Sequence, residues 1–165
     1  MNMRLLLLVL ITGIFFTGCK KDETCNYNEC AVVVPDSESQ MVKDYLDANN
    51  ITATKHCSGM YYVVENAGTG GTPDICNYIS IHYKGMLTNG NVFDQTTTTP
   101  ALFQLGGLIA AWKNVIPKIK EGGRLVMYVP PSLGYGNTDA RDQNGNVVIP
   151  ANSILIFEVD LLQVQ

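Results

Sequence analysis

Residues 81–94 read IHYKGMLTNGNVFD, and this stretch decides the fold. Apolar and aromatic residues alternate with other residues up to the pair Asn89-Gly90, and the apolar residues then resume. Alternation with a period of two is typical of a strand with one buried face, and Asn-Gly between two such runs predicts a β-hairpin. The hairpin carries Tyr83 and Phe93, and Asp94 follows at once. Aromatic side chains beside a polar group suit the lining of a pocket better than the filling of a small core.

Strand patterns continue on both sides of this hairpin. We expect strands at residues 60–65, 77–84, 91–94, 102–105, 124–129 and 154–162. One short helix is expected at residues 111–115, because Ile109, Trp112 and Ile116 recur at helical spacing and Pro117 cannot continue a helix without losing a hydrogen bond. The fold class is therefore α+β, with a curved antiparallel sheet of five to six strands wrapping one short α-helix and an N-terminal helical appendage.

The first 18 residues have the pattern of a secretory signal peptide. One arginine precedes an unbroken apolar run that is short for a membrane-spanning helix, and small residues lead to Cys19. Residues 16–19 (FTGC) resemble a bacterial lipobox, which implies cleavage before Cys19 and lipidation of its thiol. An ordinary signal peptide that leaves a free cysteine is the alternative. Residues 19–35 would then be a lipidated tether, and the protein would be exported and lipid-anchored to the cell envelope, at the outer membrane of a Gram-negative bacterium. The sequence leaves the periplasmic and external faces open.

Residues 36–58 are predicted to form an N-terminal helical extension, and residues 59–165 the main domain. Asp36 or Ser37 can cap the helix, and Met41, Val42, Tyr45 and Leu46 fall on one face of it. An amphipathic face outside the main domain could also serve a homodimer or a partner.

Four cysteines follow Cys19, and an even number in an exported chain predicts disulfides. Three connectivities are open. We favour Cys57–Cys76, because a hairpin between the strands that they flank would bring them together, and this leaves Cys25–Cys30 to close a short loop.

The formal net charge of −4 gives no electrostatic reason to expect nucleic acid as a partner. Two histidines without a cluster at metal-ligand spacing predict neither a metal nor another cofactor. In the loop 137–148, Asp142, Asn144 and Asn146 alternate as in a calcium loop, but the closing glutamate is missing. An Asn-Gly turn is the favoured interpretation.

Four blocks occur in order and at matching spacing: IHYKGMLTNGNVFD (81–94), FQLGGLIAAW (103–112), EGGRLVMYVPPSLGYG (121–136) and IPANSILIFEVDLL (149–162). Over residues 59–165 the chain resembles the FKBP family of peptidyl-prolyl cis-trans isomerases. The family fold, a curved antiparallel sheet around a short helix, agrees with the pattern of predicted elements.

The resemblance implies a prolyl pocket. Its catalytic positions match Tyr83, Phe93, Asp94, Ile109, Trp112, Tyr135 and Phe157, and its substrate-binding positions match Phe103, Leu108 and Ile149.

The implied function is isomerisation of X–Pro bonds in proline-containing exported polypeptides, which assists their folding. Such a reaction needs no nucleophile or metal, because an apolar cavity that fits the twisted amide better than the planar one already lowers the barrier. The alternative is a low-turnover chaperone or binding lipoprotein that uses the same pocket.

Overall fold

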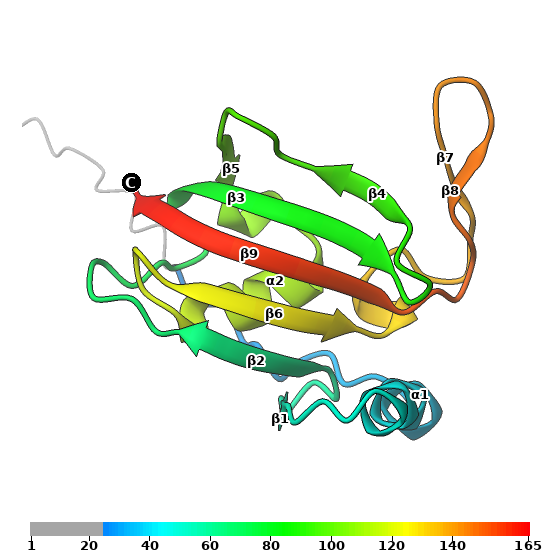
Figure 1. Cartoon of the computed structure of the whole chain (residues 1–165). Coiled ribbons are helices and arrows are strands. Elements are labelled where there is room, and N and C mark those ends of the chain that lie inside the picture. The colour runs from blue at the N-terminus through cyan, green and yellow to red at the C-terminus, as the bar shows by residue number, and fades with distance from the viewer. Residues whose placement is uncertain (1–24) are drawn as a thin grey trace, which may run out of the picture.

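The structure is a computed structural model that describes residues 25–165, so the predicted signal peptide, Cys19 and the start of the tether lie outside the described residues. A curved antiparallel sheet dominates the fold, with strand order β1-β2-β6-β9-β3-β4 and β5 paired to β3 (Figure 1). The helix α2 (Ala110–Val115) lies against one face, and α1 (Asp36–Ala48) lies beside one end of the sheet. None of the helices within residues 25–165 is long and apolar enough to cross a membrane.

The predicted strands are all present, with ends that differ from the predicted ones by at most three residues. They are β2 (Tyr61–Asn66), β3 (Tyr78–Leu87), β4 (Val92–Gln95), β5 (Ala101–Gln104), β6 (Arg124–Val129) and β9 (Leu155–Val164). Three short strands were not expected: β1 (Thr54–Lys55) at the edge of the sheet, and the hairpin of β7 (Ala140–Arg141) and β8 (Val147–Ile149), which projects from one end of the sheet (Figure 1). Runs of two or three residues are too short to show a period.

The two longest strands, β3 and β9, lie side by side at the centre of the sheet. Their inward side chains are buried in one core with α2 and with alternate residues of β6, as the period of two predicts. These inward residues are Ile79, Ile81, Leu125, Met127, Val129, Leu155, Phe157, Val159 and Leu161.

The other face of β6 is buried as well. Val126 and Tyr128 pack with Ile156 of β9 against α1, which contributes Val42 and Leu46. The predicted apolar face of α1 therefore covers part of its own sheet. The expected cap is wrong: the helix begins at Asp36 directly after Pro35, and no side chain caps it. The ring of Pro35 fixes its φ angle and so restricts the direction from which the chain enters the helix.

Short 3₁₀ turns flank the other helix. The turn η1 (Leu105–Gly107) precedes α2, and η2 (Ile116–Lys118) follows it at Pro117, where the helix was predicted to end.

The predicted disulfide pairing is wrong. The bonds join Cys25 to Cys76 and Cys30 to Cys57. Cys57 precedes β2 and Cys76 precedes β3, but β2 pairs with β6 and β3 pairs with β9, so no hairpin brings these two cysteines together. The segment of residues 25–35 instead runs along the domain, and each of its cysteines meets a partner there.

Candidate active site

A cavity of about 220 Å³ opens between the sheet and α2. Eight of the ten site residues predicted from the sequence line this cavity. The lining residues are Tyr83, Asp94, Phe103, Leu108, Ile109, Trp112, Tyr135 and Phe157.

The lining side chains come from elements far apart in sequence. Tyr83 and Phe157 are inward residues of the adjacent strands β3 and β9, while Asp94 and Phe103 come from the short strands β4 and β5. Leu108 and Ile109 stand between η1 and α2, Trp112 lies in α2, and Tyr135 follows the turn η3 (Pro131–Leu133). Several loops must therefore be held in place for the cavity to keep its shape.

Trp112 forms the centre of an aromatic wall. Its ring meets Phe157 edge-to-face at 5.3 Å between centroids, Tyr83 at 5.4 Å and Phe103 at 6.4 Å. Such T-shaped contacts are the preferred geometry of aromatic pairs and hold the rings in fixed orientations. The indole Nε1 is buried and lacks a hydrogen-bond partner among the described residues. A buried unpaired donor is uncommon and is consistent with a functional site.

One edge of the cavity is polar. The Tyr83 hydroxyl donates a hydrogen bond of 2.6 Å to Asp94 Oδ2. Burial, together with this bond and the charge of Asp94, raises the pKa of Tyr83 far above its ordinary value. Burial and the charge of Asp94 also raise the pKa of Tyr135. Both phenols therefore stay neutral at physiological pH and can act as hydrogen-bond donors.

Two of the ten predicted residues, Phe93 and Ile149, are not among those that line the cavity. Phe93 packs edge-to-face on Phe157 at 5.5 Å and so supports a ring of the cavity wall. Ile149, at the end of β8, is only 3% exposed and lies in the core cluster with Trp112.

Gly85 is a site residue that the sequence analysis missed. It lies in β3 opposite Phe157 of β9 and Asp94 of β4. A Cβ atom there would lie 2.6 Å from the ring of Phe93 and 2.9 Å from that of Phe157. A glycine inside a strand often marks such a close approach, and this signal could have found it.

Metal-type ligands gather at two places in the described residues, and neither lines the cavity. One group is Cys25, Asp74 and Cys76, and the other is Glu29, His56 and Cys57. The cysteine sulfurs of both groups are in disulfides.

The 137–148 loop folds into the β7–β8 hairpin, whose turn Asp142 organises. Its Oδ1 accepts the backbone N–H groups of Asn144 and Asn146, and its Oδ2 accepts the Asn146 amide. These contacts are those of an Asx turn. The favoured Asn-Gly pair, Asn144-Gly145, lies in this turn, and Gly145 has the positive φ of 84° that glycine tolerates.

A curved antiparallel sheet around a short helix, with an aromatic cavity between them, is the arrangement of an FKBP-like fold. Residues 70–162, more than half of the chain, match the family described as FKBP-type peptidyl-prolyl cis-trans isomerase, and the chain belongs to this family. The resemblance seen in the four sequence blocks is thereby confirmed.

Similar proteins carry the same family name. A probable FKBP-type peptidyl-prolyl cis-trans isomerase of Haemophilus influenzae is 38% identical over 109 residues, which cover 65% of this chain and 43% of that protein. The FkpA isomerase of Escherichia coli is 37% identical over 110 residues, covering 66% of this chain and 38% of FkpA. The crystal structure of Escherichia coli FkpA superposes with a TM-score of 0.66 at 32% identity, over 79% of this chain and 60% of that chain. This chain therefore spans less than half the length of these curated relatives.

Proposed function

We propose that the protein catalyses cis–trans isomerisation of X–Pro bonds in exported polypeptides and so assists their folding. The observation that carries the proposal is the cavity itself, because Trp112, Phe157 and Tyr83 form a rigid apolar enclosure with a polar edge at Asp94. Family membership and the relatives' names support the same reaction.

The proposed mechanism is differential binding of the twisted amide. The planar X–Pro amide is stabilised by resonance, and its rotation barrier is about 18–20 kcal/mol. The twisted state has less charge separation, so an aromatic cavity that accepts the proline ring favours it over the planar state. Each tenfold of acceleration requires about 1.4 kcal/mol of such preference.

Hydrogen-bond donors at the rim would orient the substrate. Ile109 directly precedes α2, and the first N–H groups of a helix have no partner within the helix. Its N–H could therefore bind a substrate carbonyl, and the neutral Tyr135 hydroxyl could bind the chain on the other side. Asp94 fixes Tyr83 through their hydrogen bond and gives the mouth a negative charge.

The direct test is a cis-to-trans assay with short X–Pro peptides on the purified, disulfide-bonded protein. Asp94→Ala removes the acceptor of Tyr83 at the cavity edge, and Asp36→Ala, at an exposed position on α1, is the matched control. We expect clear acceleration by the wild type and by the control, and a loss of several-fold in kcat/KM for Asp94→Ala. Folded wild type without acceleration would overturn the enzyme proposal, and suppression of client aggregation by that inactive protein would support the binding-module alternative.

Export is supported by the predicted signal peptide and by two disulfides, which persist in oxidising compartments. Lipidation at Cys19 and anchoring at the outer membrane are also part of the proposal. Mass spectrometry of the mature protein from membranes tests them: a diacylglyceryl-modified Cys19 at the N-terminus is expected, and an unmodified N-terminus would contradict the anchor.

A homodimer through the N-terminal extension is also part of the proposal, and a monomeric mass in solution would exclude it.

A further inference from the structure

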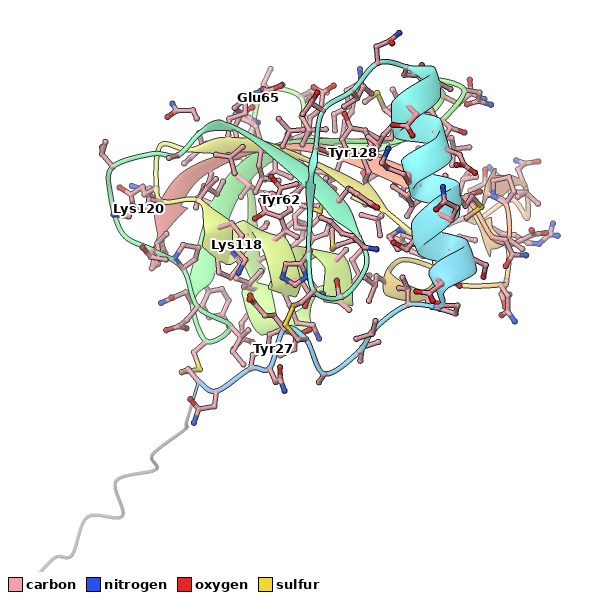
Figure 2. The ribbon with its side chains drawn as sticks, turned by 90° about the horizontal axis from the view of Figure 1, so that it is seen from below. Tyr27, Tyr62, Glu65, Lys118, Lys120 and Tyr128 are labelled. Carbon is pink, nitrogen blue, oxygen red and sulfur yellow. A yellow bond between two sulfur atoms is a disulfide. The ribbon has the colours of Figure 1, made fainter. Side chains whose placement is uncertain are left out.

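The segment of residues 25–35, here called the strap, lies outside the matched family region and runs beneath α2 (Figure 2). Two disulfides fasten it to the domain, one at Cys25–Cys76 and one at Cys30–Cys57. Its far end is also fixed, since Val34 is buried in the main core and its N–H donates to the carbonyl of Ser58.

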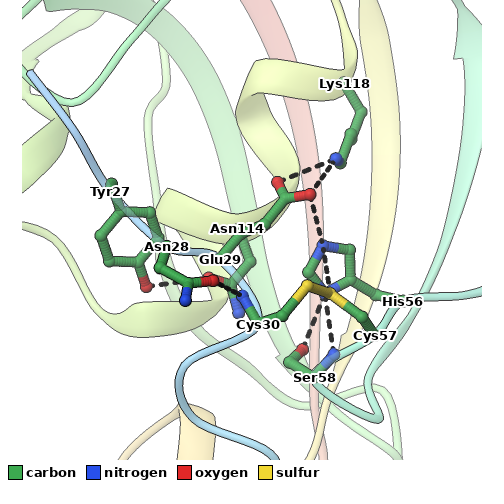
Figure 3. Close-up of a disulfide and its surroundings, with 9 residues drawn as sticks. All are labelled: Tyr27, Asn28, Glu29, Cys30, His56, Cys57, Ser58, Asn114 and Lys118. Atoms are coloured by element: carbon green, nitrogen blue, oxygen red, sulfur yellow. Dashed lines mark hydrogen bonds and ion pairs between the residues drawn. A yellow bond between two sulfur atoms is a disulfide. The ribbon is translucent and has the colours of Figure 1, made fainter.

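Between the two disulfides, the strap contacts α2 and η2 at three points. The Tyr27 hydroxyl donates a 2.8 Å hydrogen bond to Asn114 Oδ1 (Figure 3). Lys113 Nζ lies 5.3 Å from the centroid of the same Tyr27 ring. Glu29 pairs with Lys118 Nζ at 2.7 Å. The strap therefore holds the helix that carries Trp112.

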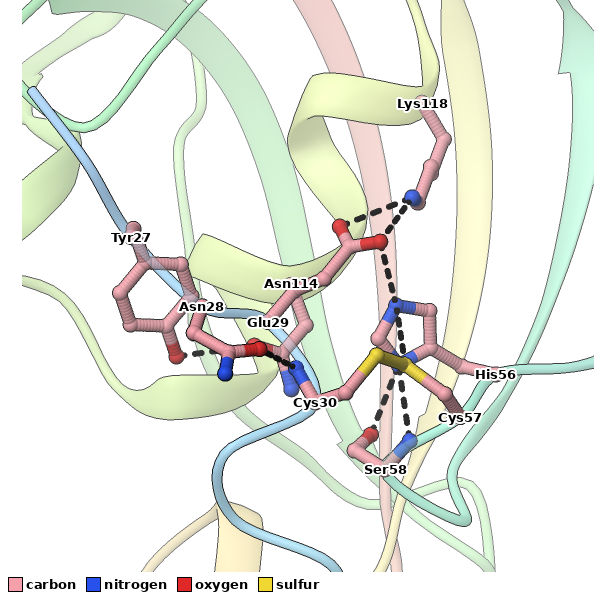
Figure 4. A network of polar contacts seen from close by, with 9 residues as sticks. All are labelled: Tyr27, Asn28, Glu29, Cys30, His56, Cys57, Ser58, Asn114 and Lys118. Carbon is pink, nitrogen blue, oxygen red and sulfur yellow. Dashed lines mark hydrogen bonds and ion pairs between the residues drawn. A yellow bond between two sulfur atoms is a disulfide. The ribbon is translucent and has the colours of Figure 1, made fainter.

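On its other side, Glu29 lies next to His56, which belongs to the segment between β1 and β2 (Figure 4). His56 Nδ1 lies 3.2 Å from the backbone nitrogen of Ser58 and accepts its N–H, and His56 Nε2 lies 3.7 Å from Glu29 Oε1. Burial alone would raise the pKa of the Glu29 carboxyl, but the hydrogen bond and charge of Lys118, together with His56 in its protonated form, outweigh it and lower the pKa. The ionised carboxylate pairs with Lys118 of η2 and lies next to His56 of the segment between β1 and β2.

The helix needs such support. With six residues, α2 is far shorter than a helix that is stable alone, so its position depends on tertiary contacts. Asn114 is only 1% exposed, and Tyr27 supplies its side-chain carbonyl with a hydrogen bond. Without that donor a buried acceptor would be unpaired, and a small shift of α2 toward water would relieve the cost. Any such shift would move Trp112 and Ile109 in the cavity wall.

We propose that Tyr27 is a positioning residue of the active site, which holds α2, and with it Trp112, from the face opposite the cavity through Asn114. The inference rests on the proposed isomerase function. Tyr27 does not line the cavity, and the disulfides at Cys25 and Cys30 fasten the strap on both sides of it.

The test is Tyr27→Phe, which removes only the hydroxyl and keeps the ring beneath Lys113. The matched control is Tyr78→Phe, at an exposed tyrosine on β3 outside the cavity lining. Two readouts are taken well below the thermal midpoint of each variant: kcat/KM on X–Pro peptides, and the emission of Trp112, which is the single tryptophan of the chain. A merely stabilising role would change the midpoint but neither readout in the folded state.

We expect Tyr27→Phe to lower kcat/KM by about threefold to tenfold, the equivalent of one hydrogen bond, and to shift the Trp112 emission. Tyr78→Phe should match the wild type in both. Unchanged kcat/KM and emission in folded Tyr27→Phe would overturn the inference. If the wild type shows no turnover, the proposed function fails, and the Trp112 emission of the two variants still decides whether the strap positions the helix.

Discussion

Gly85 leaves no room for a side chain beside the cavity wall. Two aromatic rings, those of Phe93 and Phe157, close over its Cα, and a Cβ atom would lie under 3.0 Å from both. Phe157 lines the cavity and Phe93 supports it, so the glycine sets how closely the wall can approach β3.

Gly85→Ala is therefore expected to displace the Phe93–Phe157 pair and lower prolyl turnover. Overpacking of this kind costs about 1–3 kcal/mol of stability. Denaturant unfolding and the peptide assay measure the two effects. Gly71→Ala is the control, since its Cβ would make only an ordinary contact at 3.7 Å. A variant with wild-type turnover would show that the spacing of the ring pair does not limit the site.

His56 predicts a pH dependence of stability. The residue is only 6% exposed, and burial lowers its pKa below the ordinary 6.5, with Lys118 adding to the shift and Glu29 opposing it. Above pH 6.5 the histidine is neutral in both states, and its contribution is fully present. As the pH falls below 6.5 the unfolded chain takes up the proton first, so stability falls until the folded-state pKa is reached. Thermal midpoints between pH 7 and pH 5 should therefore decrease, and His56→Gln should flatten the slope. An equal slope in the variant would contradict this role.

At the scale of elements, α1 contacts the loop that carries Tyr135. The Glu38 carboxylate accepts the backbone N–H of Ser132 at 2.9 Å and its hydroxyl at 2.6 Å. Ser132 belongs to η3, three residues before Tyr135. An N-terminal helix thus stabilises a segment of the proposed site.

Glu38→Ala removes both acceptors and is expected to cost about 1 kcal/mol of unfolding free energy, because the contact is exposed. Glu38→Gln keeps a carbonyl for the Ser132 N–H and should recover most of the loss. Denaturant titration compares the two with Asp36→Ala. Equal stability of Glu38→Ala and the wild type would mean that α1 is held by its apolar face alone.

At the scale of the whole molecule, the disulfides join the strap to the domain over sequence separations of 51 and 27 residues. Each bond restricts the unfolded chain, and the loss of one native disulfide typically costs about 2–5 kcal/mol. Replacing Cys25 and Cys76 together by serine should lower the thermal midpoint, as should replacing Cys30 and Cys57. Calorimetry with and without a reductant provides the check. Midpoints that do not respond to reduction would contradict a stabilising role for the bonds.

Local patterns were sufficient for most of the fold. The alternation in β3 and β9 predicted which side chains point inward, Pro117 predicted the end of α2, and Asn89-Gly90 predicted the turn before β4. These features depend on period and backbone chemistry within a few residues, so a single sequence reveals them. The resemblance to the family supplied the ten site residues, and eight of them line the cavity.

The sequence by itself determined the strands, the short helix, the family and most of the residues that gather at the cavity. Only the tertiary structure decided the disulfide pairing, the course of the strap beneath α2, the contact of Glu38 with Ser132 and the space above Gly85. The physical reason is the distance along the sequence between the residues that each feature involves. The side-chain period and the turn chemistry depend on residues a few positions apart. Cys25 contacts Cys76, and Tyr27 contacts Asn114, only because strands that are not consecutive in the sequence pair in the sheet and bring distant segments together.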